Sequence, residues 1–378
     1  MSHGTMKFFC IALLALLTAC ASDNDKLGQN AAKLLEFKST AKINVRWHKD
    51  IGSAGNTMLQ PTISPDAIYV ANARGKVSRL ERTSGKRKWR LDTGYTIAAG
   101  VGAGNDLVLL GGLKGELTAY AENGKTRWKT KVTSEVLNAP QVADGIVVVR
   151  TDDGRIAGLD AADGKRLWLY EYTTPALIVR SHAGFAIQHG TIYAGFPGGK
   201  MAAISLANGT VIWESVVSQP HGNTELERIS DITSTPVVDN DQVCAVAFQG
   251  RVACFGLAQG NLLWTRDLSS NMGLMLLDKT LYLTDADGAV LALDKSNGSS
   301  IWRNDQLARR HTTAPYVAGN HLVVGDRAGY VHVMKRENGA MEARLQTDGS
   351  AIVAAPVEMD GGMLVQTHGG GLYSLAIQ

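Results

Sequence analysis

Cys20 is the first residue of this chain whose surroundings suggest a definite chemistry. It ends the segment LTAC (residues 17–20), which follows Lys7 and the apolar run FFCIALLALL (residues 8–17). A basic start, a short apolar core and small residues before a break are typical of a secretory signal, and this core is too short to span a membrane permanently. The cysteine thiol can carry a thioether-linked lipid, so we predict a lipoprotein signal peptide (residues 1–19), lipidation of Cys20 and a polar tether (residues 20–41). The alternative is a plain secretory signal with a chance cysteine.

A second pair of cysteines, Cys244 and Cys254, lies symmetrically about Gln249 in the segment CAVAFQGRVAC. Because a hairpin turn is expected beside Gln249, the two side chains should face each other across adjacent strands. In an oxidising compartment such a pair can form a disulfide. Two small buried thiols are the competing interpretation, since cross-strand geometry is often unfavourable for a disulfide.

Acidic pairs are the remaining candidates for metal or acid–base chemistry. Asp152 and Asp153, and likewise Asp285 and Asp287, come just before turn glycines, where Asp is favoured because it bonds its own backbone. The segment DADG (residues 285–288) resembles the start of a calcium loop but lacks the downstream spacing and the bidentate glutamate. We therefore predict turns at these positions, with no metal and no cofactor.

Other sites of chemistry are equally unsupported. The nine histidines are scattered, and the closest pair, His182 and His189, does not have the spacing of a metal site. The chain has no G-x-S-x-G elbow and no Walker glycine loop. Charged residues make up 19% of the chain and nearly balance at +3, which argues against a nucleic-acid-binding protein. The sequence therefore predicts a protein that is not an enzyme.

A repeat dominates the rest of the chain. The pattern Gly-x-x-x-Trp occurs at Gly85, Gly124, Gly164, Gly209, Gly260 and Gly298, and a further copy at Gly339 has Ala343 in place of tryptophan. A second pattern, Gly-x-φ-x-x-φ with φ apolar, begins at Gly75, Gly115, Gly154, Gly199, Gly250, Gly288, Gly329 and Gly370. The period of about 40 residues, with two hairpin turns and short β-rich runs, is typical of a β-propeller. We predict an all-β fold with eight four-stranded antiparallel blades over residues 42–378.

Closure of the ring follows from the two ends of this region. Trp47 has no turn of its own before it, and the chain stops soon after Gly370. We expect the strand of Trp47 to complete the last blade, which leaves no long unpaired edge between the chain ends. The tryptophan rings should then pack between neighbouring blades, with a tryptophan cage for a cationic ligand as the weaker alternative.

Two connections break the rhythm of the repeat. The segments after Trp168 and Trp213 are longer than the others and include PALIVRSHAG (residues 175–184) and QPHGNTELERISDITSTP (residues 219–236). Departures from a repeat often carry the function, and both connections should emerge on the face that bears the Gly75-type turns. An apolar cluster ending in Arg180 has the composition of a protein-interaction hot spot. The alternative is that Leu177 and Val179 begin an inner strand.

With the lipoprotein signal and the eight blades, the segments PALIVRS and NTELERISDITSTPVV resemble the BamB family, the propeller lipoproteins of the bacterial outer-membrane β-barrel assembly machinery. The resemblance covers essentially the whole mature chain. It implies a scaffold in the Bam complex that binds the periplasmic POTRA region of BamA, contacts other Bam subunits, and assists unfolded β-barrel precursors. It places the protein on the periplasmic side of the outer membrane, held by the lipid anchor alone. The family's contact positions match Leu177, Val179, Arg180 and Asp231, although Thr233 stands where the family often has a second acid.

Two other functions compete with this interpretation. Eight-bladed propellers with the Gly-x-x-x-Trp turn also resemble pyrroloquinoline-quinone-dependent dehydrogenases, which have adjacent cysteines and calcium-binding carboxylates that this chain lacks. Redox activity with added quinone and calcium would favour that class. A generic periplasmic protein-binding propeller would be favoured if the two long connections were dispensable.

Overall fold

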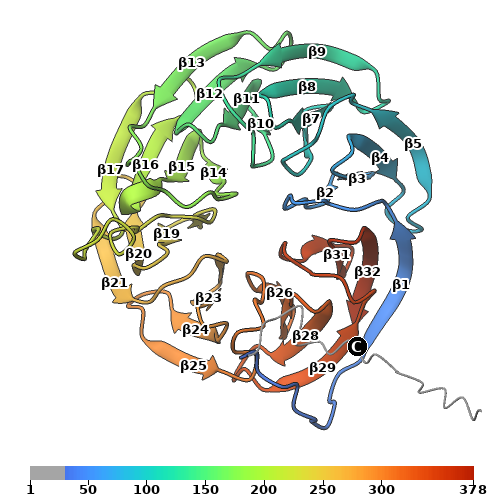
Figure 1. The fold of residues 1–378 in the computed structure, drawn as a ribbon, viewed down its shortest axis with the longest axis vertical. Coiled ribbons are helices and arrows are strands. Elements are labelled where there is room, and N and C mark those ends of the chain that lie inside the picture. The colour runs from blue at the N-terminus through green and yellow to red at the C-terminus, as the bar shows by residue number, and fades with distance from the viewer. Residues whose placement is uncertain (1–29) are drawn as a thin grey trace, which may run out of the picture.

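The protein forms a closed ring of β-sheets. The computed structural model describes residues 30–378 and shows eight four-stranded sheets around a central axis (Figure 1). Neighbouring strands within each sheet are antiparallel, so the predicted eight-bladed propeller is confirmed. The predicted signal peptide and Cys20 lie outside the described residues. No helix within residues 30–378 is long and apolar enough to cross a membrane.

Each blade runs from an inner strand at the axis to an outer strand at the rim. The inner strands are β2 (Thr62–Ile63), β6 (Gly102–Gly104), β10 (Gln141–Ala143), β14 (Phe185–Gln188), β18 (Val237–Val238), β22 (Leu274–Leu277), β26 (Tyr316–Ala318) and β30 (Val357–Met359). The second strands are β3 (Ile68–Ala71), β7 (Leu107–Gly111), β11 (Ile146–Arg150), β15 (Thr191–Gly195), β19 (Gln242–Val246), β23 (Thr280–Thr284), β27 (His321–Gly325) and β31 (Gly362–Gln366).

The third strands are β4 (Lys76–Leu80), β8 (Glu116–Ala121), β12 (Arg155–Asp160), β16 (Lys200–Ser205), β20 (Arg251–Gly256), β24 (Val290–Asp294), β28 (Tyr330–Lys335) and β32 (Gly371–Ile377). The outer strands are β5 (Arg87–Asp92), β9 (Thr126–Lys131), β13 (Arg166–Glu171), β17 (Val211–Val216), β21 (Leu262–Asp267), β25 (Ser300–Asn304), β29 (Met341–Gln346) and β1 (Ile43–Asp50). A short 3₁₀ turn, η1 (Pro197–Gly199), precedes β16. Blades are numbered 1 to 8 from the blade that contains β2, and β1 completes blade 8.

Strand β1 closes the ring as expected. It pairs antiparallel with β32, from Ile43 opposite Ile377 to Asp50 opposite Gly371. The outer strand of blade 8 therefore comes from one end of the ring sequence and its other three strands come from the opposite end. This pairing ties the first and last segments of the propeller into one sheet.

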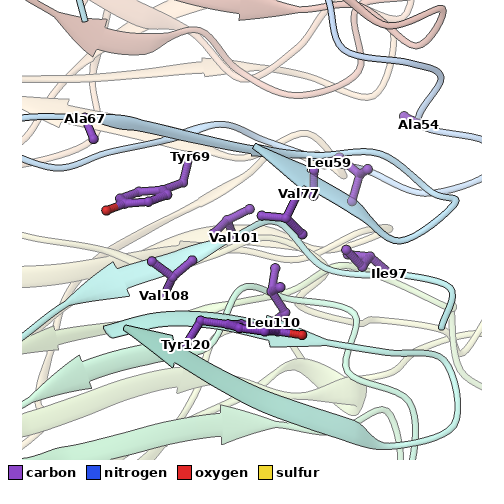
Figure 2. Packing of buried hydrophobic residues seen from close by; sticks show 11 residues of the cluster. Ala54, Leu59, Ala67, Tyr69, Val77, Ile97, Val101, Val108, Leu110 and Tyr120 are labelled. Carbon is purple, nitrogen blue, oxygen red and sulfur yellow. The ribbon is translucent and has the colours of Figure 1, made fainter. Parts of the chain in front are cut away.

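The core lies between neighbouring blades. Between blades 1 and 2, Tyr69 and Val77 pack toward Val108 and Leu110, and all four are buried (Figure 2). Because every blade is covered by a neighbour on both faces, the second strands are buried along nearly their whole length and read as continuous apolar runs. Outer strands instead alternate a buried tryptophan with exposed residues.

The tryptophans form a repeated joint between blades. Each indole Nε1 donates a hydrogen bond to a backbone carbonyl in the turn that follows the third strand of the next blade, as in Trp213 to Leu257 at 2.8 Å. The equivalent pairs are Trp47–Arg82, Trp89–Glu122, Trp128–Ala161, Trp168–Leu206, Trp264–Lys295 and Trp302–Arg336. A Cβ atom at Gly209 would lie 2.6 Å from the Trp168 ring, and Gly209 has a φ of 72°. Apart from Gly124, the glycine of each such turn thus makes room for the preceding blade's tryptophan, and the expected packing between blades is confirmed.

Ala343 marks the one joint where this arrangement has no counterpart. In blade 8 the third strand, β32, and the outer strand, β1, come from different parts of the chain, so no turn connects them. A tryptophan at position 343 would therefore have neither a turn carbonyl to bond nor a glycine to cover. Ala343 is buried instead, in a cluster to which Ala41 and Ile43 add partly buried side chains.

Residues 32–41, which belong to the predicted tether, lie against the ring. The backbone N–H of Ala32 donates to Ala308 at 2.9 Å, and the N–H of Thr40 donates to Glu342 at 3.0 Å. Leu34 and Phe37 are half-buried against the apolar cluster between blades 6 and 7. We call residues 32–41 the N-terminal segment.

One face of the ring carries both the Gly75-type turns and the connections between blades. The N–H of Tyr172 donates to the carbonyl of Gly154 at 3.1 Å, and the N–H of Val217 donates to that of Gly199 at 2.8 Å. These bonds join the start of a connection to the turn of the blade that it leaves. We call this side the upper face, and both long connections emerge on it.

Candidate functional site

The first long connection is an irregular loop on the upper face. After β13 ends at Glu171, no strand forms until β14 begins at Phe185. Leu177 and Val179 therefore lie in the loop and do not begin an inner strand. Leu177 is 41% exposed, so its side chain is accessible to a partner.

Asp231, from the second long connection, holds this loop in place. Its carboxylate is buried, with Oδ2 accepting the N–H of Val179 at 2.7 Å and Oδ1 accepting that of Gly198 at 2.8 Å. Hydrogen bonds from backbone donors to a carboxylate are among the strong ones in proteins. The carboxylate thus links the two long connections to η1, and it faces the protein interior rather than solvent.

Further hydrogen bonds hold the end of the loop. His182 contacts the carbonyl of Leu137 through Nδ1 at 2.8 Å, and the Asn138 side chain donates to the carbonyl of His182 at 3.2 Å. Arg150 donates to the carbonyl of Gly184 at 3.2 Å. Burial lowers the pKa of Arg150 to about 10, so its guanidinium stays charged at neutral pH beneath the loop. The loop that presents Leu177 is therefore fixed by the neighbouring blades.

Arg180 supplies the exposed charge of the loop. Its side chain is 58% exposed, and the guanidinium pairs with Glu135 at 2.5 Å. Glu135 also lies near Asp152, whose pKa is raised by burial first and by the charge of Glu135 second, while the charge of Arg180 opposes the rise. Arg180 and Glu135 thus form an accessible ion pair. A carboxylate of a partner could replace Glu135 as the group that pairs with Arg180.

The tip of the second connection is exposed and organised by Glu227. The Glu227 carboxylate accepts the N–H groups of Asn223 at 2.8 Å and Thr224 at 3.1 Å, and these bonds lower its pKa. Leu226, at 67% exposure, projects from this tip. From Ser230 to Ser234 the chain is buried again. The upper face therefore presents two ordered apolar side chains, Leu177 and Leu226, on neighbouring connections.

The mouth of the central channel borders the same loop. A cavity of 610 Å³ is lined by the last residues of the connections into the inner strands, including Val179, Arg180 and His182. Among the described residues that line it, Arg180 is the one with a permanent charge. The exposed arginine therefore stands at the edge of an otherwise uncharged opening.

The acidic pairs act within their own turns. One oxygen of Asp285 accepts the N–H of Asp287 at 3.0 Å and that of Ala289 at 2.8 Å, and the other pairs with Arg303. Asp153 pairs with Arg155 across its turn. Within residues 30–378 no cluster of three or more His, Cys, Asp or Glu side chains could hold a metal ion. The turn interpretation is confirmed for Asp285, whose carboxylate bonds the backbone of its own turn.

Cys244 and Cys254 face each other in register on β19 and β20. Their Cα atoms are 4.1 Å apart and the structure joins their sulfurs in a disulfide. Both residues are fully buried. The bond lies inside blade 5, away from the surface of the upper face.

Sequence reasoning overlooked Glu135 and the inward-facing role of Asp231. Glu135 lies in an ordinary connection of the preceding blade, with no spacing that links it to Arg180. The burial of Asp231 depends on contacts with Val179 and Gly198, which are remote in sequence. A short pattern cannot predict such contacts.

The eight four-stranded sheets define a β-propeller, and its upper face presents two ordered loops. The model of the family described as "Outer membrane protein assembly factor BamB" matches residues 73–304 and 287–378. The chain belongs to this family. Members of the family are outer membrane protein assembly factors, and this chain is accordingly an assembly factor and not an enzyme.

Individual relatives agree with this assignment. The chain is 40% identical to the outer membrane protein assembly factor BamB of Nitrosomonas eutropha, over 99% of this chain and 95% of that protein. The crystal structure of BamB from Moraxella catarrhalis is similar with a TM-score of 0.82 and 25% identity, covering 89% of this chain and all of that chain. A quinohemoprotein alcohol dehydrogenase from Comamonas testosteroni has a TM-score of 0.71 at 13% identity, covering 88% of this chain and 76% of its own, which shows a shared fold alone.

Proposed function

We propose that this protein is a scaffold of the Bam complex that docks the periplasmic POTRA region of BamA on its upper face. The docking surface consists of Leu177, Val179 and Arg180. By holding the POTRA chain, the protein assists the folding and insertion of β-barrel proteins into the outer membrane.

The observation that carries this proposal is the buried Asp231 carboxylate, which fixes the backbone of Val179 beside that of Gly198. A loop ordered before binding loses little conformational entropy on association. Arginine is one of the residue types enriched in the energetic hot spots of interfaces, and Leu177 adds exposed apolar area in the same loop. Asp231 then contributes by positioning the loop, whereas Leu177 and Arg180 touch the partner.

Cys20 gives the protein its location in this proposal. A lipid on the Cys20 thiol anchors the chain to the inner leaflet of the outer membrane, with the propeller in the periplasm. Acyl chains attached to a folded domain can hold it to a membrane without a spanning segment, and stable anchoring takes more than one chain. Unfolded β-barrel precursors are the proposed clients, and exposed outer strands could bind them by strand addition.

A capture experiment tests the partner and the site together. The BamA periplasmic region from the same organism is incubated with the mature protein lacking lipid, with its Arg180→Glu variant, and with Arg127→Glu as a control on the exposed rim. We expect the wild type and Arg127→Glu to capture BamA, and a folded Arg180→Glu to lose it because the charge is reversed. Equal capture by all three would move the site away from Arg180, and no capture by the wild type would refute the partner.

A further inference from the structure

The exposed residues of the outer strands are aliphatic on one part of the rim and charged on the rest. In four consecutive blades the residue before the tryptophan is an exposed aliphatic: Leu167 (52% exposed), Ile212 (50%), Leu263 (45%) and Ile301 (51%). Val211, Val216 and Leu262 on the same outer strands are also about half exposed. We call these residues on β13, β17, β21 and β25 the apolar arc.

The corresponding positions elsewhere carry charge. They are Arg46 on β1, Lys88 on β5, Arg127 on β9 and Glu342 on β29. Charged side chains on edge strands normally prevent association through the unpaired backbone groups of the edge. The apolar arc lacks that protection at the position where the other blades have it. Single exposed aliphatic residues are ordinary, but four consecutive blades repeat them at the same position of the outer strand.

One outer strand, β29 in blade 7, already carries an added segment of the chain, although the position equivalent to the apolar arc is Glu342 there. The N-terminal segment (residues 32–41) lies along blade 7, where the carbonyl of Glu342 accepts the N–H groups of Thr40 at 3.0 Å and Ala41 at 3.3 Å. The Arg344 guanidinium donates to the carbonyl of Leu35 and lies 5.1 Å from the centre of the Phe37 ring. Figure 1 shows this part of the chain in dark blue, passing the rim beside β29 before it enters β1.

Side chains of the N-terminal segment enter the joint between two blades. Leu34 and Phe37 pack against the cluster that contains Trp302 and Met341. Beside Trp302 and Ile301 a surface hollow of 490 Å³ remains, which Tyr282 and Arg336 also line. The rim therefore accepts a single chain segment that bonds an outer strand through its backbone and inserts apolar side chains beside the tryptophan.

We propose that the apolar arc binds an extended, unfolded segment of another polypeptide whose alternate residues are apolar, laid along the rim as residues 32–41 lie along β29. This inference rests on the proposed function and deepens it, because it assigns the client chain to blades 3–6 and leaves the upper face to the partner. The occupant is a non-native strand and not a second folded copy, since the precedent within this chain is a segment without helix or strand. Its free backbone groups would bond the open edge, and its apolar side chains would cover the aliphatic residues.

The test uses a fluorescent synthetic peptide of alternating valine and threonine residues, with fluorescence anisotropy as the measurement. The variant Ile212→Lys/Leu263→Lys should fold normally because Lys88 and Arg127 already occupy the equivalent positions in other blades. We expect peptide binding to weaken about tenfold or more, as each lost apolar contact contributes on the order of that factor. The matched control Lys88→Gln/Arg127→Gln should bind the peptide like the wild type.

Two comparisons make the outcome decisive. Ile212→Lys/Leu263→Lys should still capture BamA, while Arg180→Glu should still bind the peptide, so failure of one proposal is separable from failure of the other. Unchanged peptide affinity in Ile212→Lys/Leu263→Lys, or no binding by the wild type, would overturn the inference. A wild-type dimer in sedimentation that this variant dissolves would overturn it as well, because the arc would then serve a second copy.

Discussion

The joints between blades and the loop around Leu177 use their polar groups for different purposes. The indole N–H groups join one blade to the next, whereas the Asp231 carboxylate fixes a single surface loop. Seven of the eight joints repeat one solution, in which an indole donates to a turn carbonyl of the next blade, and stability is spread around the ring. The loop is built once, and the Asp231 carboxylate serves to hold a backbone that leaves Leu177 and Arg180 exposed. The repeat stabilises the ring, and we propose that its irregular connections carry binding. Changes at the joints should therefore reduce stability without altering docking, and changes at the loop should do the reverse.

Trp213→Ala should have the largest effect on stability. The substitution empties a buried site between blades 4 and 5 and removes the Nε1 bond to Leu257. We expect the free energy of unfolding to fall by about 3–5 kcal/mol. Urea titration followed by circular dichroism measures it, and the folded fraction should still capture BamA. If a folded variant no longer captured BamA, the joints would affect docking as well as stability, contrary to expectation.

Reduction of the Cys244–Cys254 disulfide should have a smaller effect of the same kind. The bond closes a loop with a sequence separation of 10, so its loss should lower the free energy of unfolding by about 2–3 kcal/mol. Urea midpoints with and without dithiothreitol provide the measurement. A Cys244→Ala/Cys254→Ala variant serves as the control and should show no response to the reductant. A wild type that is equally insensitive would mean that the two thiols are not joined.

Much of the ring could be predicted from sequence because its signals are local. Glycines that need positive φ and the tryptophan that follows them recur at a constant spacing, and each repeat describes its own blade. The loss of tryptophan at position 343 was visible in the sequence, but its cause was not. That cause is the missing turn between β32 and β1, which appears only when the ring closes.

The candidate site was predictable in location but not in architecture. Unequal spacing after Trp168 and Trp213 pointed to the two long connections. Whether Asp231 faces solvent or the protein depends on backbone groups at Val179 and Gly198, and no local pattern contains them. The apolar arc does have a local signal. The residue at the position before the tryptophan is aliphatic in blades 3–6 and charged in the other four blades. Its meaning depends on all outer strands sharing one rim.

Asp231→Ala tests whether the buried carboxylate holds the loop around Leu177. The change leaves the N–H groups of Val179 and Gly198 without their acceptor, at a cost of about 1–3 kcal/mol. Hydrogen–deuterium exchange should rise in residues 175–184 and stay unchanged in β19 and β20. BamA affinity should fall although Leu177 and Arg180 are intact. Protection that persists in the loop would show that Asp231 does not hold it.

Mild acid should weaken the ring where the N-terminal segment is fastened. Buried Asp326 accepts hydrogen bonds from Arg310 at 2.7 Å and His332 at 2.9 Å, and Arg310 also donates to the carbonyl of Ala32 at 3.1 Å. Burial lowers the pKa of His332 despite its bond to Asp326. The unfolded chain therefore takes up a proton below about pH 6.5 that the folded chain refuses, and stability falls as pH decreases from there toward the folded pKa.

His332→Gln tests this contribution because glutamine keeps a neutral donor and acceptor. Urea unfolding at pH 7.5 and pH 5.5 should show a smaller loss of stability in the variant than in the wild type. His311, whose pKa is also lowered by burial and then by Arg327, contributes in the same direction in both proteins. The difference between the two slopes therefore isolates His332, and equal slopes would exclude it as the titrating group.

We propose that the loop around Leu177 touches BamA while the rim does not. A photoreactive benzoyl-phenylalanine at position 177 tests it in the intact complex, with the same group at position 88 of the rim as the control. We expect a crosslink to the POTRA region from position 177 and none from position 88. A crosslink from position 88 with none from position 177 would contradict it.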